Sequence, residues 1–253
     1  MKINIIFPYN TRSGAYRSTF ELSNHLASFG EDVEIYIPFV PYLDGAELFS
    51  TRALRLIARG LVRSAVRRNQ IPWFDLRVPI RIVPLISDSF VRDADIVMAN
   101  HWPTAYSVAG LSAAKGRKFR FIRDTELDFS NGRSVAGSYE LPLKQIVVAP
   151  WLKTHLEDAY GAEIVSVIQN GINMSDFEVP DRQYHRPPVV CFSYCDEPRK
   201  GMSDGFEVLA EVQRRYPDVK IVMFGWKKPK RVPEGVEFHA GLAKEKLRAV
   251  YGS

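Results

Sequence analysis

Short apolar runs alternate with stretches of helical spacing along most of the chain. Residues 3–8 form a first apolar run that ends at a proline, and residues 16–28 then carry apolar side chains at the spacing of a helix. Residues 33–37 form the next apolar run, and Gly30 before it is suited to ending the helix. A strand, a helix and a strand in this order predict a parallel sheet with right-handed crossovers.

The same alternation continues to residue 168. Further strands are predicted at residues 81–85, 95–99, 119–122, 145–149 and 165–168, with a helix over 106–114 and another that ends at 160. Strands that alternate with helices in this way are typical of a doubly wound α/β domain. We therefore predict a first Rossmann-like domain over residues 1–179.

A second domain is predicted after a linker. Residues 180–188 hold three prolines among polar residues and are predicted to be the linker. The pattern then restarts over residues 189–253, which is about half of the length that a second doubly wound domain requires. The expected fold class is α/β with two Rossmann-like domains, the second of them incomplete in this chain.

Composition places the chain among ordinary globular proteins, with 253 residues, 46% of them hydrophobic, 25% charged, and a net charge of +5. No run of about 18 apolar residues occurs and no signal peptide precedes the first strand, so no segment is expected to span a membrane. Cys191 and Cys195 stand four residues apart without His or Cys companions nearby, which indicates neither a disulfide framework nor a zinc site. We expect no metal and a cytoplasmic protein.

The stretch from residue 50 to residue 69 concentrates positive charge. It carries six arginines and no acid, beside apolar residues at helical spacing. One interpretation is a surface helix that docks its apolar side on the domain. The other is an interfacial helix on anionic lipid, where each cation near the surface contributes about 1 kcal/mol. Nucleic acid is not expected as a partner, because no aromatic residue stands among these arginines and no nucleic-acid-binding motif occurs.

The stretch SYCDEPRKG at residues 193–201 joins a predicted strand to a predicted helix. A loop followed by a helix start offers backbone N–H groups and the positive end of the helix dipole, and Arg199 and Lys200 add two cations before Gly201. This arrangement is suited to binding phosphate. The alternative is that both cations are ordinary solvated loop residues.

Two residues of the first domain follow predicted strands, where ligands of α/β sheets collect. His101 follows strand 95–99, and its alternative role is to cap a helix or to pack on Trp102. Glu126 follows strand 119–122 and could hydrogen-bond hydroxyl groups or act as a base; the alternative is a plain surface carboxylate.

The first strand–helix loop contains Arg12, Ser13 and Gly14. Its lone glycine does not make the G-x-G-x-x-G pattern of dinucleotide-binding folds, so a dinucleotide is not expected here. The loop is a candidate for lining a ligand cleft, and its alternative is an ordinary tight turn.

Several short motifs resemble, in order and spacing, those of the GT-B-fold glycosyltransferases of family 4, along nearly the whole chain. Residues 170–173 with Phe177 resemble the NG(I/V)D…F signature that closes the first domain. Arg199-Lys200-Gly201 resembles the loop that binds the donor diphosphate, and residues 217–225 and 236–241 resemble the two strand motifs that follow it. Residues 100–106, 122–129 and 151–152 are similar to the bacterial rhamnosyltransferase-like branch.

The sequence departs from that family in two places. Tyr194-Cys195 stand where the usual pattern has a Gly-Arg pair, and Arg199 would replace the missing cation. The family's E-x7-E segment, whose acids contact the donor sugar and ribose, would begin shortly after Ser253. The resemblance therefore implies a chain that is truncated within the second domain.

The resemblance implies a retaining glycosyltransferase that moves a sugar from a nucleotide-diphosphate sugar to a glycan or lipid-linked glycan, in bacterial surface polysaccharide synthesis at the inner membrane face. It implies no obligatory metal and no cofactor. Arg199 and Lys200 would stabilise charge on the leaving diphosphate, and His101 would contact the donor sugar. Two alternatives are an acceptor- or membrane-binding module that is inactive alone, and a GT-B relative with other chemistry, such as a sugar-nucleotide epimerase.

Overall fold

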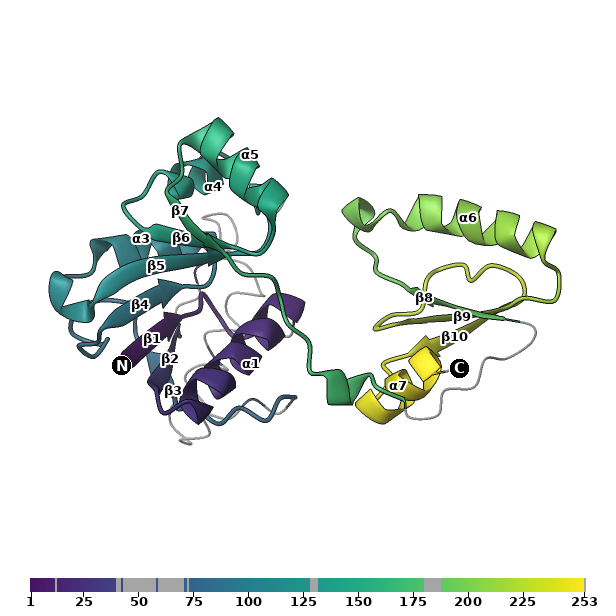
Figure 1. Ribbon diagram of the computed structural model, residues 1–253, viewed down its shortest axis with the longest axis horizontal. Helices are drawn as coiled ribbons and strands as arrows, with labels where there is room; N and C mark the ends of the chain where they lie inside the picture. The colour runs from purple at the N-terminus through teal and green to yellow at the C-terminus, as the bar shows by residue number, and fades with distance from the viewer. Residues whose placement is uncertain are drawn as a thin grey trace. The chain divides into compact units, whose positions relative to one another are not determined.

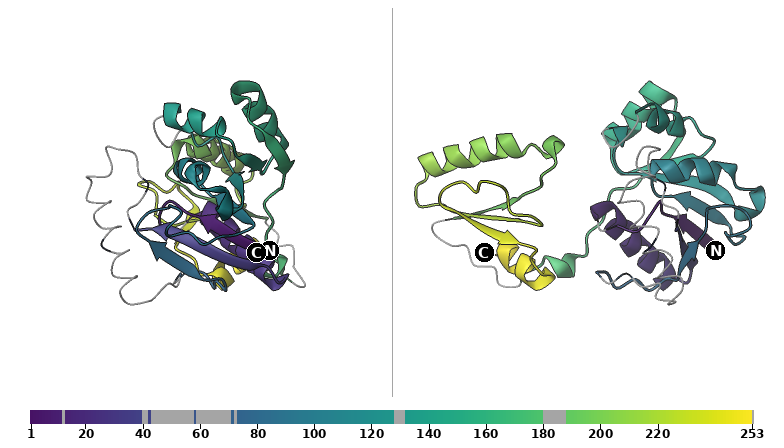
Figure 2. Two further views of the ribbon diagram at one scale, coloured as in Figure 1. Left: turned by 90° about the vertical axis from the view of Figure 1, so that its left-hand side faces the viewer. Right: turned by 180° about the vertical axis from the view of Figure 1, so that it is seen from behind.

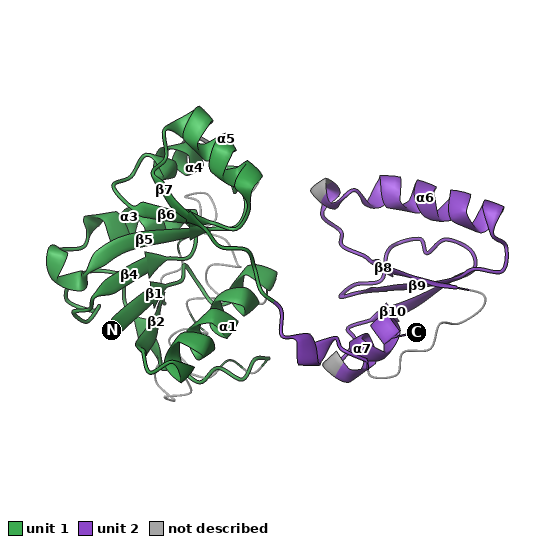
Figure 3. Cartoon of the chain, viewed as in Figure 1, with its two compact units in different colours: residues 1–171 green, residues 172–253 purple. Residues whose placement is uncertain are grey.

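The computed structural model describes residues 1–11, 13–39, 42, 58, 71, 73–127, 132–179 and 188–252, without the side chains of residues 132, 133, 199 and 244. Figure 1 shows its helices and strands. Arg12, the arginine-rich stretch 50–69 apart from residue 58, and linker residues 180–187 lie outside this description. The chain divides into two compact units, unit 1 (Met1–Gly171) and unit 2 (Ile172–Ser253), which are coloured separately in Figure 3.

Unit 1 is built on a seven-stranded sheet in which every neighbouring pair of strands is parallel. The strand order is β3-β2-β1-β4-β5-β6-β7. The strands are β1 (Lys2–Ile6), β2 (Asp32–Pro38), β3 (Ile80–Val83), β4 (Ile96–Ala99), β5 (Arg117–Ile122), β6 (Lys144–Val147) and β7 (Ile164–Val167). The predicted α/β fold class with a parallel sheet is confirmed.

Helices cover both faces of this sheet, as Figures 1 and 2 show from different sides. The helix α1 (Gly14–Ser28) lies on one face, and α3 (Trp102–Gly110), α4 (Gly132–Tyr139) and α5 (Pro150–Tyr160) lie on the other. Successive side chains of a strand point to opposite faces of the sheet. In β1, Ile5 packs with Phe20 of α1, whereas Ile6 belongs to the cluster that contains Val108 of α3. The sheet is therefore buried on both sides, which agrees with the near-continuous apolar runs of its strands.

Two helices of unit 1 differ from what the sequence predicts. The helix expected over residues 106–114 begins at Trp102 and ends at Gly110, because Pro103 is suited to its first turn and the backbone of His101 is extended just before it. The helix α4 was not predicted from the sequence. Its eight residues GRSVAGSY include few large apolar side chains, and Val135 and Tyr139 are the buried ones among them.

Unit 2 contains a three-stranded parallel sheet in the order β10-β9-β8. Its elements are β8 (Val189–Ser193), α6 (Met202–Arg215), β9 (Lys220–Gly225), β10 (Val236–Ala240) and α7 (Lys244–Gly252), with short 3-10 helices at Met174–Asp176 and Pro198–Lys200. The two faces of β8 meet different helices. A Cβ atom on Gly205 of α6 would lie 2.4 Å from the ring of Phe192, whereas the thiol of Cys191 donates to the carbonyl of Val250 in α7 at 3.0 Å.

None of the helices in the described part of the chain is long and apolar enough to cross a membrane.

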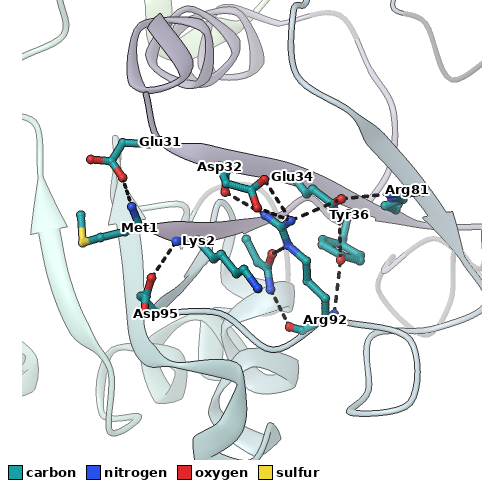
Figure 4. A network of polar contacts seen from close by, with 10 residues as sticks. Met1, Lys2, Glu31, Asp32, Glu34, Tyr36, Arg81, Arg92 and Asp95 are labelled. Atoms are coloured by element: carbon teal, nitrogen blue, oxygen red, sulfur yellow. Dashed lines mark hydrogen bonds and ion pairs between the residues drawn. The ribbon is translucent and has the colours of Figure 1, made fainter. Parts of the chain in front are cut away.

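A polar network stabilises the face of the sheet opposite α1 (Figure 4). Arg92 donates to the carboxylate of Asp32 at 2.9 and 3.0 Å and to the side chain of Asn4 at 3.1 Å. The buried carboxylate of Glu34 accepts from Arg81 at 2.9 Å and from the hydroxyl of Tyr36 at 2.8 Å. These contacts tie β1, β2 and β3 to the segment that precedes β4.

The network sets the ionisation of its two buried members. Burial by itself would raise the pKa of Glu34, but the hydrogen bonds from Arg81 and Tyr36 and the positive charges of Arg92 and Arg81 outweigh it and lower that pKa. Burial, together with the hydrogen bond to Glu34, raises the pKa of Tyr36 to about 12. At neutral pH Glu34 is therefore a carboxylate and Tyr36 a neutral donor.

Glu34→Gln is expected to weaken the loss of stability in acid. Folding lowers the pKa of Glu34, so its contribution is fully present above the ordinary value of 4.5 and is lost as the pH falls through the lower folded value. Urea unfolding of the intact chain at a series of pH values below 5 measures this slope. Glu140→Gln, at an exposed carboxylate, is the matched control. An unchanged acid slope in Glu34→Gln would contradict the assignment.

Candidate functional site

The strand order of unit 1 reverses beside β1. From β1 the chain proceeds to β2 and β3 on one side and returns to β4 on the other side. In open α/β sheets, ligands bind outside the carboxyl ends of the strands at such a reversal. The residues that follow β1, β4 and β5 are therefore the candidate site of unit 1.

His101 stands at the junction between β4 and α3. The N–H of Asn100 still continues the sheet by donating to the carbonyl of Ile6 at 3.0 Å, and the helix begins at Trp102. Thr104 fixes the junction, because its hydroxyl donates to the carbonyl of His101 at 2.7 Å and accepts from the N–H of His101 at 3.3 Å. The backbone of His101 thus caps the helix, while its imidazole faces Glu126.

Glu126 is buried beside His101, with 7% of its surface exposed. Its Oε1 atom lies 3.4 Å from Nε2 of His101, and its Oε2 accepts from the backbone N–H of Trp102 at 3.2 Å. Its φ angle is +59°, and among the described residues no other non-glycine residue has a positive φ. Such a backbone costs on the order of 1–3 kcal/mol and is found where surrounding contacts enforce it. Because the Glu126 side chain is buried, the alternative of a plain surface carboxylate is wrong.

Arg120 is a further member of the site, and sequence analysis did not identify it. Its side chain is completely buried on β5 and donates to Oε2 of Glu126 at 2.6 Å and to the hydroxyl of Ser138 at 2.8 Å. The guanidinium also lies 4.5 Å from the centre of the Tyr139 ring. The available signal was that Arg120 shares a face of its strand with the apolar Ile122, which is buried in the structure.

A second arginine at the same edge is held by a different set of groups. Arg123 donates to Ser18 at 3.0 Å and to Asn100 at 2.9 Å, and it also donates to the hydroxyl of Thr19. Burial lowers the pKa of Arg123 to about 10, and Glu126 and Tyr16 oppose this shift. Arg123 remains positively charged at neutral pH, and its donors are used to join α1 to β4 and β5.

The surroundings of His101 favour its neutral form. Burial lowers the pKa of His101 below its ordinary value of 6.5; the Glu126 carboxylate opposes this, and the charges of Arg120 and Arg123 act with it. Its Nδ1 atom is buried beside the start of α3, where the side chain of His101 forms a capping box with the backbone N–H of Thr104. Nδ2 of the neighbouring Asn100 is buried and has no hydrogen-bond partner among the described residues. Buried polar atoms without partners are uncommon in folded proteins, and bound water or a ligand is a usual explanation.

The first strand–helix loop contributes a helix start. Ser13 is the N-cap of α1, and its hydroxyl accepts from the N–H of Tyr16 at 3.3 Å. Gly14 is the first residue of the helix, and a Cβ atom there would have no heavy atom within 4 Å. Gly14 is thus not required by a tight turn or a close approach. Arg12 lies outside the described residues.

The predicted phosphate loop of unit 2 has the expected order of elements. It leaves β8 at Ser193, passes through the 3-10 turn Pro198–Lys200, and enters α6 at Met202. Lys200 is exposed, and Gly201 has a φ of +66°, the left-handed conformation that favours glycine. The first N–H groups of α6 have no carbonyl partner within the helix, which makes this end electropositive. Asp204 places one carboxylate in the same first turn.

The base of this loop is braced against β9. The N–H of Tyr194 donates to the carbonyl of Phe224 at 2.8 Å, and a Cβ atom on Gly225 would lie 2.7 Å from the carbonyl oxygen of Tyr194. Asp196 accepts from Lys227 at 3.3 Å. Glycine at 225 is therefore needed for the close approach of the two chain segments. The side chain of Arg199 lies outside the description.

The structure thus brings His101 and Glu126 into contact and adds Arg120 to them. Lys200 and Gly201 belong to the other unit. Among the described residues, no group of three or more His, Cys, Asp or Glu side chains is placed to hold a metal ion.

Comparison with solved structures gives matches along nearly the whole chain. Sucrose-phosphate synthase from Thermosynechococcus elongatus matches with a TM-score of 0.61 at 14% identity, over 99% of this chain and 72% of its own. WaaG, a glycosyltransferase involved in lipopolysaccharide biosynthesis, matches with a TM-score of 0.53 at 13% identity, over 100% of this chain and 72% of its own. The catalytic domain of starch synthase IV from Arabidopsis thaliana, bound to ADP and acarbose, matches with a TM-score of 0.57 at 11% identity, over 100% of this chain and 76% of its own.

These similarities establish the GT-B fold that the sequence motifs predicted. No model of a known protein family matches the sequence, and no curated protein matches it.

Proposed function

We propose that this chain is a glycosyltransferase that moves a sugar from a nucleoside-diphosphate sugar to a hydroxyl group of a glycan or a lipid-linked glycan. The observation that carries the proposal is the match of 98–100% of the chain to glycosyltransferase and sugar-synthase structures. The order of sequence motifs supports the same activity independently, because it resembles that of family-4 enzymes and their rhamnosyltransferase-like branch.

In this proposal the loop at residues 193–201 binds the diphosphate of the donor. The leaving group carries negative charge that grows as the bond from the sugar C1 atom to the phosphate oxygen breaks. Lys200, the start of α6 and Arg199 supply positive charge at that place. Asp204 in the first turn of α6 opposes an anion there, so the two cations are needed to outweigh it.

Transfer with retention at C1 is the expected course for this family. The acceptor hydroxyl oxygen bonds C1 on the face from which the diphosphate leaves, and the hydroxyl proton passes to the departing phosphate oxygen. We propose that His101 contacts the sugar of the donor. Both oxygens of Glu126 face protein groups, so we assign Glu126 to holding His101 rather than to taking the proton from the acceptor.

We further propose that the acceptor is a surface glycan and that transfer takes place at the cytoplasmic face of a membrane. The arginine-rich stretch 50–69 supports it, because six cations without an acid favour contact with anionic lipid headgroups.

Calorimetric titration of the intact chain with nucleoside diphosphates tests donor binding. We expect at least one of UDP, ADP, GDP, CDP and dTDP to bind without added metal, and its nucleoside monophosphate to bind more weakly because it lacks the β-phosphate that Lys200 would contact. Absence of binding for every diphosphate would overturn the proposal. Binding of diphosphate without any turnover of sugar nucleotides would favour the binding-module alternative.

A further inference from the structure

The buried groups behind His101 form a chain of three charged or ionisable side chains. Arg120 donates to Oε2 of Glu126 at 2.6 Å, and Oε1 of the same carboxylate lies 3.4 Å from Nε2 of His101. Arg120 is completely buried, Glu126 is 7% exposed, and His101 is the partly exposed end of the chain. Because Arg120 is completely buried, its contact with the site runs through the carboxylate of Glu126.

We propose that Arg120 is a positioning residue, which anchors Glu126 so that the carboxylate fixes the orientation and the tautomer of the His101 imidazole at the ligand-binding edge of the sheet. The identity of the ligand rests on the proposed function. The positioning itself rests on the described contacts.

The fork of the guanidinium explains why an arginine serves here. One terminal nitrogen of Arg120 binds Glu126, and the other binds the hydroxyl of Ser138 at 2.8 Å. The ring of Tyr139 lies against the guanidinium at 4.5 Å. An arginine held on both sides sets the direction of its donors, which a lysine ammonium, as a point charge on a flexible stem, does not do.

Glu126 in turn sets the tautomer of His101. A ring nitrogen that faces a carboxylate carries the proton, so the neutral imidazole is protonated at Nε2. Nδ1 then has a lone pair and no proton, and it is buried beside the start of α3, where the His101 side chain forms a capping box with the backbone N–H of Thr104.

The charged groups around His101 define the expected titration. Glu126 raises the pKa of His101, whereas Arg120 and Arg123, both on or just after β5, lower it together with burial. Asn100 and Thr104, the polar neighbours from β4 and α3, are uncharged. A change that moves Glu126 away while keeping the charge at position 120 should therefore lower the pKa of His101 further.

Arg120→Lys in the intact chain provides this change, and NMR of the ¹⁵N-labelled histidine rings measures it, with His101→Gln to assign the signal. We expect neutral wild-type His101 to be protonated at Nε2 and Arg120→Lys to shift its titration to lower pH. Glu126→Gln should shift it at least as far, and Arg120→Lys should add nothing in the Glu126→Gln background, because Arg120 acts through Glu126. Arg117→Lys, at the exposed start of the same strand, is the matched control and should cause no shift.

A second variant decides the matter if Arg120→Lys does not fold. Ser138→Ala removes the other anchor of Arg120 and keeps every charge, so it should shift the titration of His101 in the same direction by a smaller amount. An unshifted titration in folded Arg120→Lys, or in Ser138→Ala, would overturn the proposal, as would neutral His101 protonated at Nδ1. None of these readings requires turnover, so a failure of glycosyl transfer and a failure of the positioning role are distinguishable.

Discussion

Replacing Arg120 with methionine is expected to destabilise unit 1 by about 3–5 kcal/mol, because it leaves the carboxylate of Glu126 buried without its charge partner. Methionine has a similar length and fills most of the space, so lost packing contributes little. Native domains are stable by only about 5–15 kcal/mol, and a loss of this size removes a large part of that margin. Urea unfolding at pH 7, followed by circular dichroism, measures the change.

A double-mutant cycle separates the ion pair from the packing of each residue. Glu126→Gln alone leaves the guanidinium of Arg120 buried beside a neutral group and should also destabilise. The double variant Arg120→Met/Glu126→Gln removes both charges, so its loss should be well below the sum of the two single losses. Losses that simply add would contradict the assignment of Arg120 and Glu126 as a coupled buried pair.

Replacing Lys200 with alanine is expected to slow sugar transfer by roughly 10²–10³-fold, as removal of one group that stabilises developing charge commonly does. The effect follows if Lys200, at the turn before α6, meets the β-phosphate of the donor as the bond to the sugar breaks. Release of nucleoside diphosphate from saturating sugar nucleotide measures the rate.

The matched control for Lys200→Ala is Lys220→Ala. Lys220 begins β9, at the end of the strand opposite the phosphate loop, and pairs with Glu237 on the surface. An exposed ion pair of this kind contributes only about 0–1 kcal/mol, so folding and transfer should be nearly unchanged. Equal rates for Lys200→Ala and Lys220→Ala would remove Lys200 from the donor site.

Much of the fold could be predicted because a sheet buried on both faces produces unmistakable apolar runs. The strands β1, β2 and β8 lie within two residues of the predicted ranges. The helix α4 could not be predicted in the same way. It is short, and its sequence is mostly small and polar residues that pack through tertiary contacts rather than through an apolar stripe.

Only those site residues were predicted whose residue type and position after a strand both suggest a role in ligand binding. His101 and Glu126 were candidates because each follows a strand, and the structure places them 3.4 Å apart. Arg120 was missed because an arginine inside a strand is normally predicted to lie on the surface, unless the acidic residue that pairs with it is known. The carboxylate that binds Arg120 belongs to Glu126, whose backbone is left-handed. Sequence does not predict that conformation for a glutamate.

The most direct test of glycosyl transfer is to incubate the intact chain with sugar-labelled nucleotide sugars and membranes that supply lipid-linked glycans. We expect one labelled sugar to move to a glycan acceptor, an equal amount of nucleoside diphosphate to be released, and the anomeric configuration at C1 to be retained. The variant Lys200→Ala should lose most of this transfer. If no nucleotide sugar yields nucleoside diphosphate or a labelled glycan under these conditions, the proposed function is contradicted.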